Sequence, residues 1–199
     1  MNRRGREPSP KEYLEKILED ISGTGGIYIL SATGIREEVT KDYYFYDHSI
    51  KRGRRLVKSP GGLSSIAKIP INVKGMQINE ETSVELKTKD KEEIIDEWQK
   101  QGLILYGSLF KYRASANFRK RDFDYEISFD TLYGQSPEVA RQVEVEVIGN
   151  QNYNLLNMRG LIRTFSGIEH LLIRDFPRVE IVSLTPTDEP KWKISQRLK

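Results

Sequence analysis

Residues 109–130 read LFKYRASANFRKRDFDYEISFD, and this stretch decides the fold because apolar and polar side chains alternate through two successive segments. Side chains of a β-strand point to opposite faces in turn. Both segments are therefore predicted to be strands with one apolar and one polar face, joined by a turn at RKRD. If residues 120 and 121 form the loop, the two apolar faces coincide. The predicted cross-strand pairs are then Phe118 with Phe123, Tyr112 with Phe129, Arg113 with Ser128, and Lys111 with Asp130.

A second alternating stretch, QVEVEV at residues 142–147, carries two carboxylates on one face. Glu144 and Glu146 share that face, whereas the three valines share the other. At a rise of ~3.3 Å per residue the two carboxylates lie about 7 Å apart. Two interpretations are open. The acidic face points either to solvent, as in a sheet with one packed and one solvated face, or into a wet interior that holds something cationic.

The rest of the pattern predicts an α+β protein that forms a single domain over residues 1–199. Helices are expected at residues 10–21, between Asp90 and Gly102, and at residues 154–176, from their caps and apolar spacing. Short β-rich segments separated by Gly, Pro and Ser predict strands at 27–30, 42–46, 54–57, 65–73, 81–88 and 178–184. Residues 1–8 are expected to be a flexible basic arm and residues 185–199 an extended tail.

The composition limits the kinds of ligand and metal that the chain is expected to bind. The chain has no cysteine and two histidines, so a metal would be held by oxygen ligands, which suits Mg²⁺, Mn²⁺ or Ca²⁺. The net charge of +3 predicts no general affinity for nucleic acid. The first residues lack an apolar run, and no stretch is long enough to span a bilayer, so we expect a soluble, cytoplasmic protein. Phosphate loops of the Walker type are not found. The basic clusters at residues 51–55 and 118–121 are either surface turns or RNA backbone contacts.

Charged residues of both signs are interleaved on the polar faces of the predicted strands. Lys111 and Arg113 lie on one strand, and Glu126 and Asp130 on the next. Carboxylate oxygens bind divalent metals, while guanidinium and ammonium groups bind phosphoryl oxygens. Each residue alone is more often part of a solvated ion pair. Together on one concave surface they would suit a phosphate ligand that carries a divalent metal.

From about residue 43 to 148 the chain resembles the CYTH or triphosphate tunnel metalloenzyme superfamily. That superfamily includes thiamine triphosphatases, inorganic tripolyphosphatases, class IV adenylyl cyclases and fungal-type RNA triphosphatases. The resemblance lies in DYYFYD, KRGRRLVK, SIAKI, VELKTKDKEEIIDEWQKQGL, FKYR and YEISFDTLYGQSPEVARQVEVEV. It implies an eight-stranded, mostly antiparallel closed β-barrel, or tunnel, with about three flanking helices.

The resemblance also implies a function and a site. The function would be that of a phosphohydrolase that depends on Mg²⁺ or Mn²⁺ and acts on inorganic tripolyphosphate, a nucleoside triphosphate or an RNA 5′-triphosphate. Asp130, Glu144 and Glu146 would be the catalytic and metal-binding carboxylates, so that QVEVEV would face the tunnel. The substrate contacts would be Arg54, Lys68, Lys87, Lys111 and Arg113.

The family's first strand carries Glu-x-Glu-x-Lys near the N-terminus, and this pattern is not found in residues 1–21. In SVELK, Ser83 stands where the first Glu would be. The alternative function is therefore a catalytically inactive tunnel-like barrel that binds a protein or RNA, with the basic arm or the C-terminal tail contacting a protein partner. A third hypothesis, adenylyl cyclase, predicts that ATP is converted to cyclic AMP.

Overall fold

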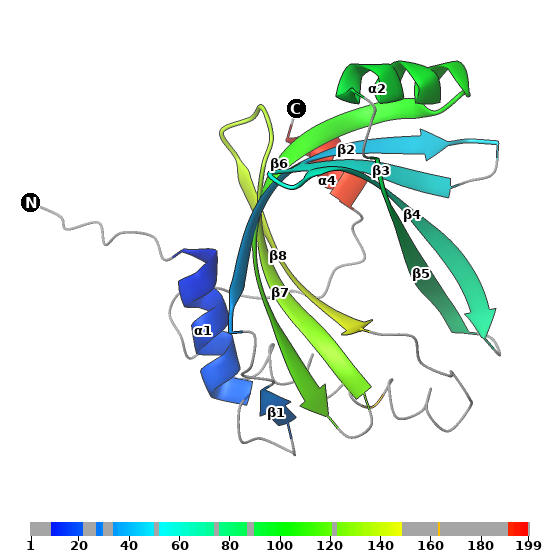
Figure 1. Cartoon of the computed structure of the whole chain (residues 1–199). Coiled ribbons are helices and arrows are strands. Elements are labelled where there is room, and N and C mark those ends of the chain that lie inside the picture. The colour runs from blue at the N-terminus through cyan, green and yellow to red at the C-terminus, as the bar shows by residue number, and fades with distance from the viewer. Residues whose placement is uncertain are drawn as a thin grey trace, which may run out of the picture. The chain divides into compact units, whose positions relative to one another are not determined.

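The computed structural model describes residues 9–21, 27–29, 34–49, 52–73, 76–86, 90–120, 123–148, 163 and 191–198. Within these residues the chain forms an α+β fold of three helices and eight strands (Figure 1). The elements in chain order are α1 (Pro10–Ile21), β1 (Ile27–Ile29), β2 (Arg36–Asp47), β3 (Arg52–Ser59), β4 (Gly62–Val73), β5 (Met76–Glu85), α2 (Lys91–Lys100), β6 (Ile104–Lys120), β7 (Phe123–Tyr133), β8 (Val139–Ile148) and α4 (Lys191–Arg197).

The strands form one sheet. Seven of them follow the order β5-β4-β3-β2-β6-β7-β8, and β1 pairs antiparallel with the end of β6. The neighbours β2 and β3, β3 and β4, and β4 and β5 are antiparallel as predicted. Over the described residues β5 and β8 are the ends of the sheet and do not pair with each other, so the predicted closed barrel is wrong. Closure depends on matching strand tilt and stagger, whereas alternation shows only which side chains share a face.

The chain packs as two compact units. Unit 1 comprises Met1–Glu37, Arg113–Thr131 and Arg141–Asp188, and unit 2 comprises Glu38–Tyr112, Leu132–Ala140 and Glu189–Lys199. Both units contain strands of the same sheet, so neither unit is shown to fold alone. The single-domain organisation therefore stays a prediction.

In unit 1, helix α1 packs on the apolar face of the sheet. The helix begins as predicted, with a reciprocal cap in which the Ser9 N–H donates to Glu12 Oε2 at 2.6 Å and the Glu12 N–H donates to Ser9 Oγ at 3.3 Å. Leu14 and Ile17 are buried, and the Tyr13 ring stacks on Phe129 of β7 with 4.8 Å between ring centroids. The apolar side chains of β6 and β7 that share this core are Ala114, Ala116, Phe118, Phe123, Tyr125, Ile127 and Phe129.

The β6 and β7 strands confirm the predicted faces but not the predicted cross-strand pairs. Strand β6 ends at Lys120 and β7 begins at Phe123, so the break between the strands comes one residue later than predicted. Phe118 stacks on Tyr125 at 5.0 Å between centroids, two residues beyond its predicted partner. Because the side-chain period of a strand is two, this shift leaves every side chain on its predicted face.

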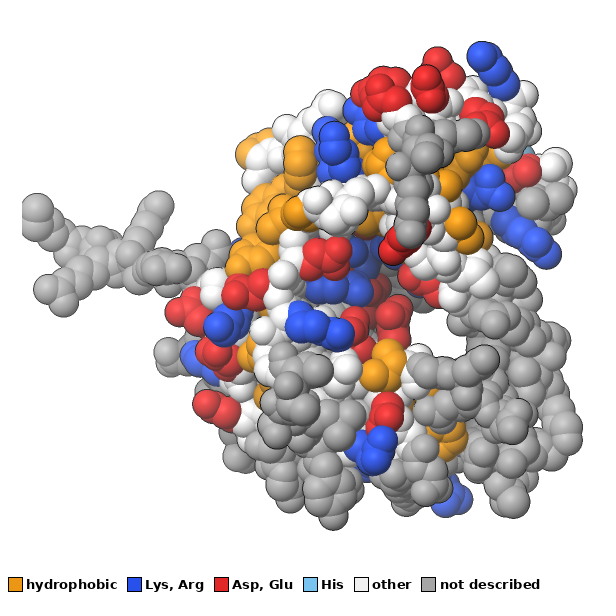
Figure 2. All heavy atoms as spheres, in the orientation of Figure 1, with side chains coloured by type: hydrophobic (Ala, Val, Ile, Leu, Met, Phe, Trp, Pro, Cys, Tyr) orange, Lys and Arg blue, Asp and Glu red, His pale blue; other side chains and the backbone are white. Residues whose placement is uncertain are grey.

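In unit 2, helix α2 covers one face of the sheet. The Asp90 side chain caps the helix by accepting from the Lys91 N–H at 2.7 Å, and the chain leaves the helix at Gly102 with a φ of 88°. The helix buries Ile94 and Trp98, and Trp98 meets the Phe45 ring of β2 edge to face. Its acidic side chains gather on the outer surface of the helix (Figure 2).

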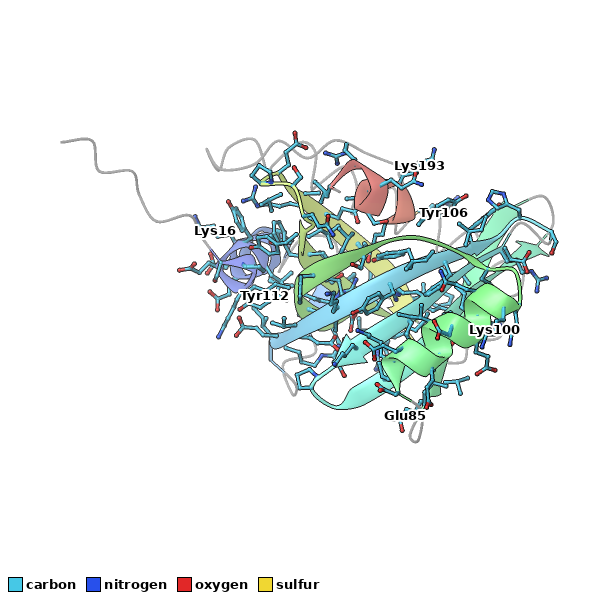
Figure 3. All side chains as sticks on the ribbon, turned by 90° about the horizontal axis from the view of Figure 1, so that it is seen from above. Lys16, Glu85, Lys100, Tyr106, Tyr112 and Lys193 are labelled. Atoms are coloured by element: carbon cyan, nitrogen blue, oxygen red, sulfur yellow. The ribbon has the colours of Figure 1, made fainter. Side chains whose placement is uncertain are left out.

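Helix α4 covers the other face in unit 2 (Figures 1 and 3). The sequence predicted an extended tail here, but Ile194 and Leu198 are buried against a cluster that includes Tyr44 of β2. The Leu198 carbonyl accepts backbone N–H bonds from residues 135 and 136 at 2.7 and 2.8 Å. A Cβ at Gly134 would lie 2.1 Å from that carbonyl oxygen, so the contact requires glycine. A helix of seven residues is stabilised by such packing, which its own sequence does not reveal.

Several predicted elements lie outside the described residues. These are the helix at 154–176 apart from residue 163, the strand at 178–184 and the basic arm at 1–8. None of the helices in the described part of the chain is long and apolar enough to cross a membrane.

Candidate functional site

The polar face of unit 1 carries a group of charged side chains that we call the Arg113 cluster. They come from the start of β2 and from β6, β7 and β8. The cluster comprises Arg36, Arg113, Glu126, Asp130, Glu144 and Glu146.

Arg113 binds the carboxylates on both neighbouring strands of this cluster. Its Nε and Nη2 donate to the two oxygens of Asp130, each at 2.7 Å, in a bidentate pair. Nη2 also donates to Glu144 Oε2 at 2.6 Å, and Nη1 lies 3.8 Å from Glu126 Oε1. The Asp130 side chain is 0% exposed and the Arg113 side chain 14%, so this ion pair is nearly removed from water.

The electrostatics of this cluster favour cations. Burial by itself would lower the pKa of Arg113, but Asp130, Glu144 and Glu146 raise the pKa above its ordinary value, so the guanidinium stays charged. Arg36 pairs with Glu126 and donates to Asn117 Oδ1 at 2.9 Å. Among the groups named here, four are carboxylates and two are guanidinium groups.

Carboxylate oxygens are the ligands that Mg²⁺ and Mn²⁺ prefer, so the donor chemistry of the Arg113 cluster fits the predicted metal. The positions of these carboxylates do not yet form a metal site. No three His, Asp or Glu side chains among the described residues are grouped so as to hold a metal ion. A metal at Asp130 and Glu144 would have to share their oxygens with Arg113.

The polar face of unit 2 carries a second group, which we call the Asp42 cluster: Thr40, Asp42, Tyr44, Arg55, Lys68, Glu81 and Lys111. Asp42 of β2 is 0% exposed. Its Oδ1 accepts from Thr40 Oγ1 at 2.7 Å. Its Oδ2 accepts from Tyr44 at 3.3 Å and lies 3.3 Å from Arg55 Nη1 and 3.5 Å from Lys111 Nζ. One carboxylate thus contacts two cations and two hydroxyl groups.

Positive charge predominates in the Asp42 cluster. Burial would raise the pKa of Asp42, but Lys111 and Arg55, helped by the Thr40 hydrogen bond and the charge of Lys191, lower it below its usual value. Burial and the Asp42 charge raise the pKa of Tyr44 well above its usual range, so this hydroxyl keeps its proton and donates. Arg55 also reaches Glu81 at 3.3 Å, as does Lys68. The named groups are three cations and two carboxylates.

The structure brings together some of the predicted site residues and separates others. Asp130, Glu144 and Arg113 are in direct contact in unit 1, and Glu146 acts on the charge of Arg113. Lys111 lies in the Asp42 cluster of unit 2 and is buried. The structure shows neither of the two further predicted substrate contacts, Lys68 and Lys87, in contact with these residues. The Lys68 side chain is 52% exposed beside Glu81, and Lys87 lies outside the described residues.

Arg54 is on the opposite face of β3 from Arg55. Its guanidinium carbon lies 4.9 Å from the centroid of the Trp98 ring on α2, while Arg55 binds Asp42. The sequence GRRLV offers two adjacent arginines, and the resemblance selected the first. Asp42 and Arg55 were missed, although alternation in DYYFYD separates Asp42 and Tyr44 from the apolar side chains of Tyr43 and Phe45. That signal would have placed Asp42 on the polar face.

No protein-family model matches the sequence, and a search of curated proteins finds no match. Solved structures share the fold. The PH1819 protein from Pyrococcus horikoshii OT3 is 15% identical, with a TM-score of 0.50 over 79% of this chain and 84% of that chain. A conserved hypothetical protein from Pyrococcus furiosus is 15% identical, with a TM-score of 0.50 over 78% and 83%.

A weaker likeness is to HpAC1 from Hippeastrum, a protein described as having a dominant triphosphatase activity. It is 14% identical, with a TM-score of 0.45 over 92% of this chain and 96% of that chain. The two Pyrococcus structures show that the fold is shared with known proteins, and at these identities they show nothing about activity. Membership of the triphosphate tunnel superfamily stays a prediction.

Proposed function

We propose that this protein is a divalent-metal-dependent phosphohydrolase that acts on a triphosphate. The observation that carries the proposal is the presence of two fully buried aspartates, Asp42 and Asp130, each bound to basic side chains on the polar face of a sheet. Burying ions in this way stabilises a fold poorly compared with apolar packing. Buried charge clusters with shifted pKa values are typical of functional sites.

Each unit by itself carries basic groups of the kind that bind phosphoryl oxygens. Lys111 and Arg55, with Lys68, would bind phosphoryl oxygens through charge-assisted hydrogen bonds. Arg113 would offset the negative charge that develops on the transferred phosphoryl group. Its bidentate pair with Asp130 fixes the plane of the guanidinium before the substrate arrives, so little reorganisation is needed.

Asp130, Glu144 and Glu146 would hold Mg²⁺ or Mn²⁺, which, when bound, polarises a phosphoryl oxygen and lowers the pKa of a water molecule. Glu144 is better placed than Asp130 to exchange partners. Its side chain is 27% exposed, whereas Asp130 is fully buried and both its oxygens accept from Arg113. Glu144 is therefore the residue whose removal tests the proposal most directly.

The test is phosphate release from tripolyphosphate and from nucleoside triphosphates, with Mg²⁺ or Mn²⁺ and with a chelator. We expect metal-dependent release by the wild type and a loss of roughly 100-fold or more in Glu144→Ala. Asp124→Ala is the matched control, because Asp124 also binds an arginine of β6 and is 31% exposed, close to the 27% of Glu144, but lies outside the Arg113 cluster. Release that is absent under every condition, or that is equal in Glu144→Ala and wild type, would contradict the proposal.

One observation favours a second candidate, a catalytically inactive module that binds triphosphate or RNA. Arg113 already neutralises Asp130 and Glu144, and the described residues hold no group of three metal ligands. This candidate predicts that calorimetry detects tripolyphosphate binding while no phosphate is released. Cyclic AMP formed from ATP in the same incubations would indicate adenylyl cyclase activity instead.

A further inference from the structure

Three strands contribute to the surroundings of Asp42. Thr40 and Tyr44 lie on its own strand β2, Arg55 lies on β3 and Lys111 on β6. Arg55 Nη1 and Lys111 Nζ both approach the same oxygen, Asp42 Oδ2, at 3.3 and 3.5 Å. The other oxygen accepts from Thr40 at 2.7 Å. One buried carboxylate oxygen therefore bridges two cations that come from different strands.

A purely structural role does not require this arrangement. The strands β2 and β3 are already joined by their backbone ladder, in which Tyr44 lies opposite Arg55. Apolar side chains fill the neighbouring part of the same face, where Tyr44 and Leu109 pack against α4. An apolar side chain in place of Asp42 would avoid the free-energy cost of removing a carboxylate from water on folding. However, it would leave two cations to repel each other, and their side chains would separate.

We propose that Asp42 is a positioning residue that holds the Arg55 guanidinium and the Lys111 ammonium side by side to bind the phosphoryl groups of a triphosphate. Asp42 itself is 0% exposed, whereas the side chains of Arg55 and Lys111 are 15% and 5% exposed, so Asp42 acts through these two cations and Arg55 is the more accessible of them. This inference rests on the proposed function. It states how Arg55 and Lys111 are held together and gives Asp42 a role that the sequence analysis did not assign.

The experiment is calorimetric titration of tripolyphosphate into the full-length wild type and its variants at constant ionic strength. In Asp42→Asn the shape is kept but the charge is lost, and we expect the Kd to rise by roughly 10- to 100-fold. Asp42→Glu restores the charge and should recover part of the affinity. Asp96→Asn, which removes an exposed carboxylate on α2, is the charge-matched control and should bind as the wild type does.

The pH profile separates positioning from a structural role. Because the Asp42 pKa is below its usual value, the carboxylate stays ionised until the solution becomes strongly acidic. Wild-type affinity should then fall in acid more steeply than that of Asp42→Asn, since only the wild type loses this charge. Comparing the two proteins cancels the titration of tripolyphosphate itself. A variant that was merely less stable would keep the wild-type pH dependence of binding.

The outcomes are distinct. If the wild type binds tripolyphosphate and Asp42→Asn binds it equally well, the inference is overturned and the proposed function stands. If the wild type neither binds tripolyphosphate nor releases phosphate, the proposed function fails and the inference with it. If Asp42→Asn does not fold, Thr40→Val and Tyr44→Phe remove one contact to Asp42 each. Each of these should raise the Kd by a smaller factor, and an unchanged Kd in both would overturn the inference.

Discussion

The Arg113 cluster of unit 1 and the Asp42 cluster of unit 2 are built in opposite ways. Each centres on an aspartate that is fully buried. In unit 1 a single guanidinium binds several carboxylates, because Arg113 reaches Asp130, Glu144 and Glu126. In unit 2 a single carboxylate binds several cations, because Asp42 contacts Arg55 and Lys111. Among the named groups, carboxylates therefore outnumber cations in the Arg113 cluster, and cations outnumber carboxylates in the Asp42 cluster.

The difference shows how a sheet with a charged face can carry two kinds of site. A group with surplus carboxylate suits a cation, whereas a group with surplus ammonium and guanidinium suits a phosphate. It also shows which substitution in each cluster should lower the stability of the fold most. Removing Arg113 takes the bidentate partner away from the buried Asp130, whereas Asp42 keeps a second cation when one is lost. The following predictions test this contrast, starting with the largest effect.

We expect Arg113→Met to lower the free energy of unfolding by about 3–5 kcal/mol, because Asp130 would remain buried with its main partner gone. Urea denaturation measures this loss. The matched control is Arg119→Met, since Arg119 forms the same bidentate pair with Asp124 at 2.6 and 2.8 Å but is 53% exposed. The control should unfold almost as the wild type does, and equal losses in the two variants would contradict the role given to burial.

We expect Lys111→Met to lower the free energy of unfolding by about 1–3 kcal/mol, less than Arg113→Met, because Asp42 keeps Arg55, Thr40 and Tyr44. The double variant Lys111→Met/Arg55→Met should lose more than the sum of the single variants. Urea denaturation of the four proteins forms the required cycle. Strict additivity would mean that the two cations do not share Asp42.

Gly134→Ala tests the docking of α4 in unit 2. The new methyl group would lie 2.1 Å from the Leu198 carbonyl oxygen, so the contact must shift, and we expect a loss of about 1–3 kcal/mol. Because Lys191 on α4 helps to lower the pKa of Asp42, a displaced helix should also raise that pKa. Thermal unfolding and carboxyl NMR titration measure the two effects. Gly61→Ala, where a Cβ meets nothing closer than 3.6 Å, is the control.

The smallest effect is the pH dependence of stability. The pKa of Asp42 is lower in the folded chain than the value of about 3.9 expected when it is unfolded. Its contribution is therefore present above that value and is lost as the pH falls through the folded pKa. Between about pH 5 and pH 2, the wild type should lose stability more steeply than Asp42→Asn. Parallel acid-denaturation curves would show that Asp42 does not carry this dependence.

Local patterns predicted much of the candidate site. Alternation identified the polar face of β6 and β7, and it placed Asp130 and Arg113 on that face even though the predicted cross-strand pairs were two residues out. The choice between Arg54 and Arg55 could not be made in the same way. Both belong to one short strand, and only the packing of α2 shows which of them faces Trp98.

The amino-acid sequence by itself determined the period of each strand, the caps of α1 and α2, and the chemical character of each face, because these depend on neighbours only a few residues apart. The tertiary structure decided three other things. It left the described sheet open, it placed the short helix α4 over Tyr44, and it grouped the charges into two clusters of opposite excess. Each of these depends on residues far apart in the chain, such as Asp42 and Lys111, whose proximity is set by strand order and register.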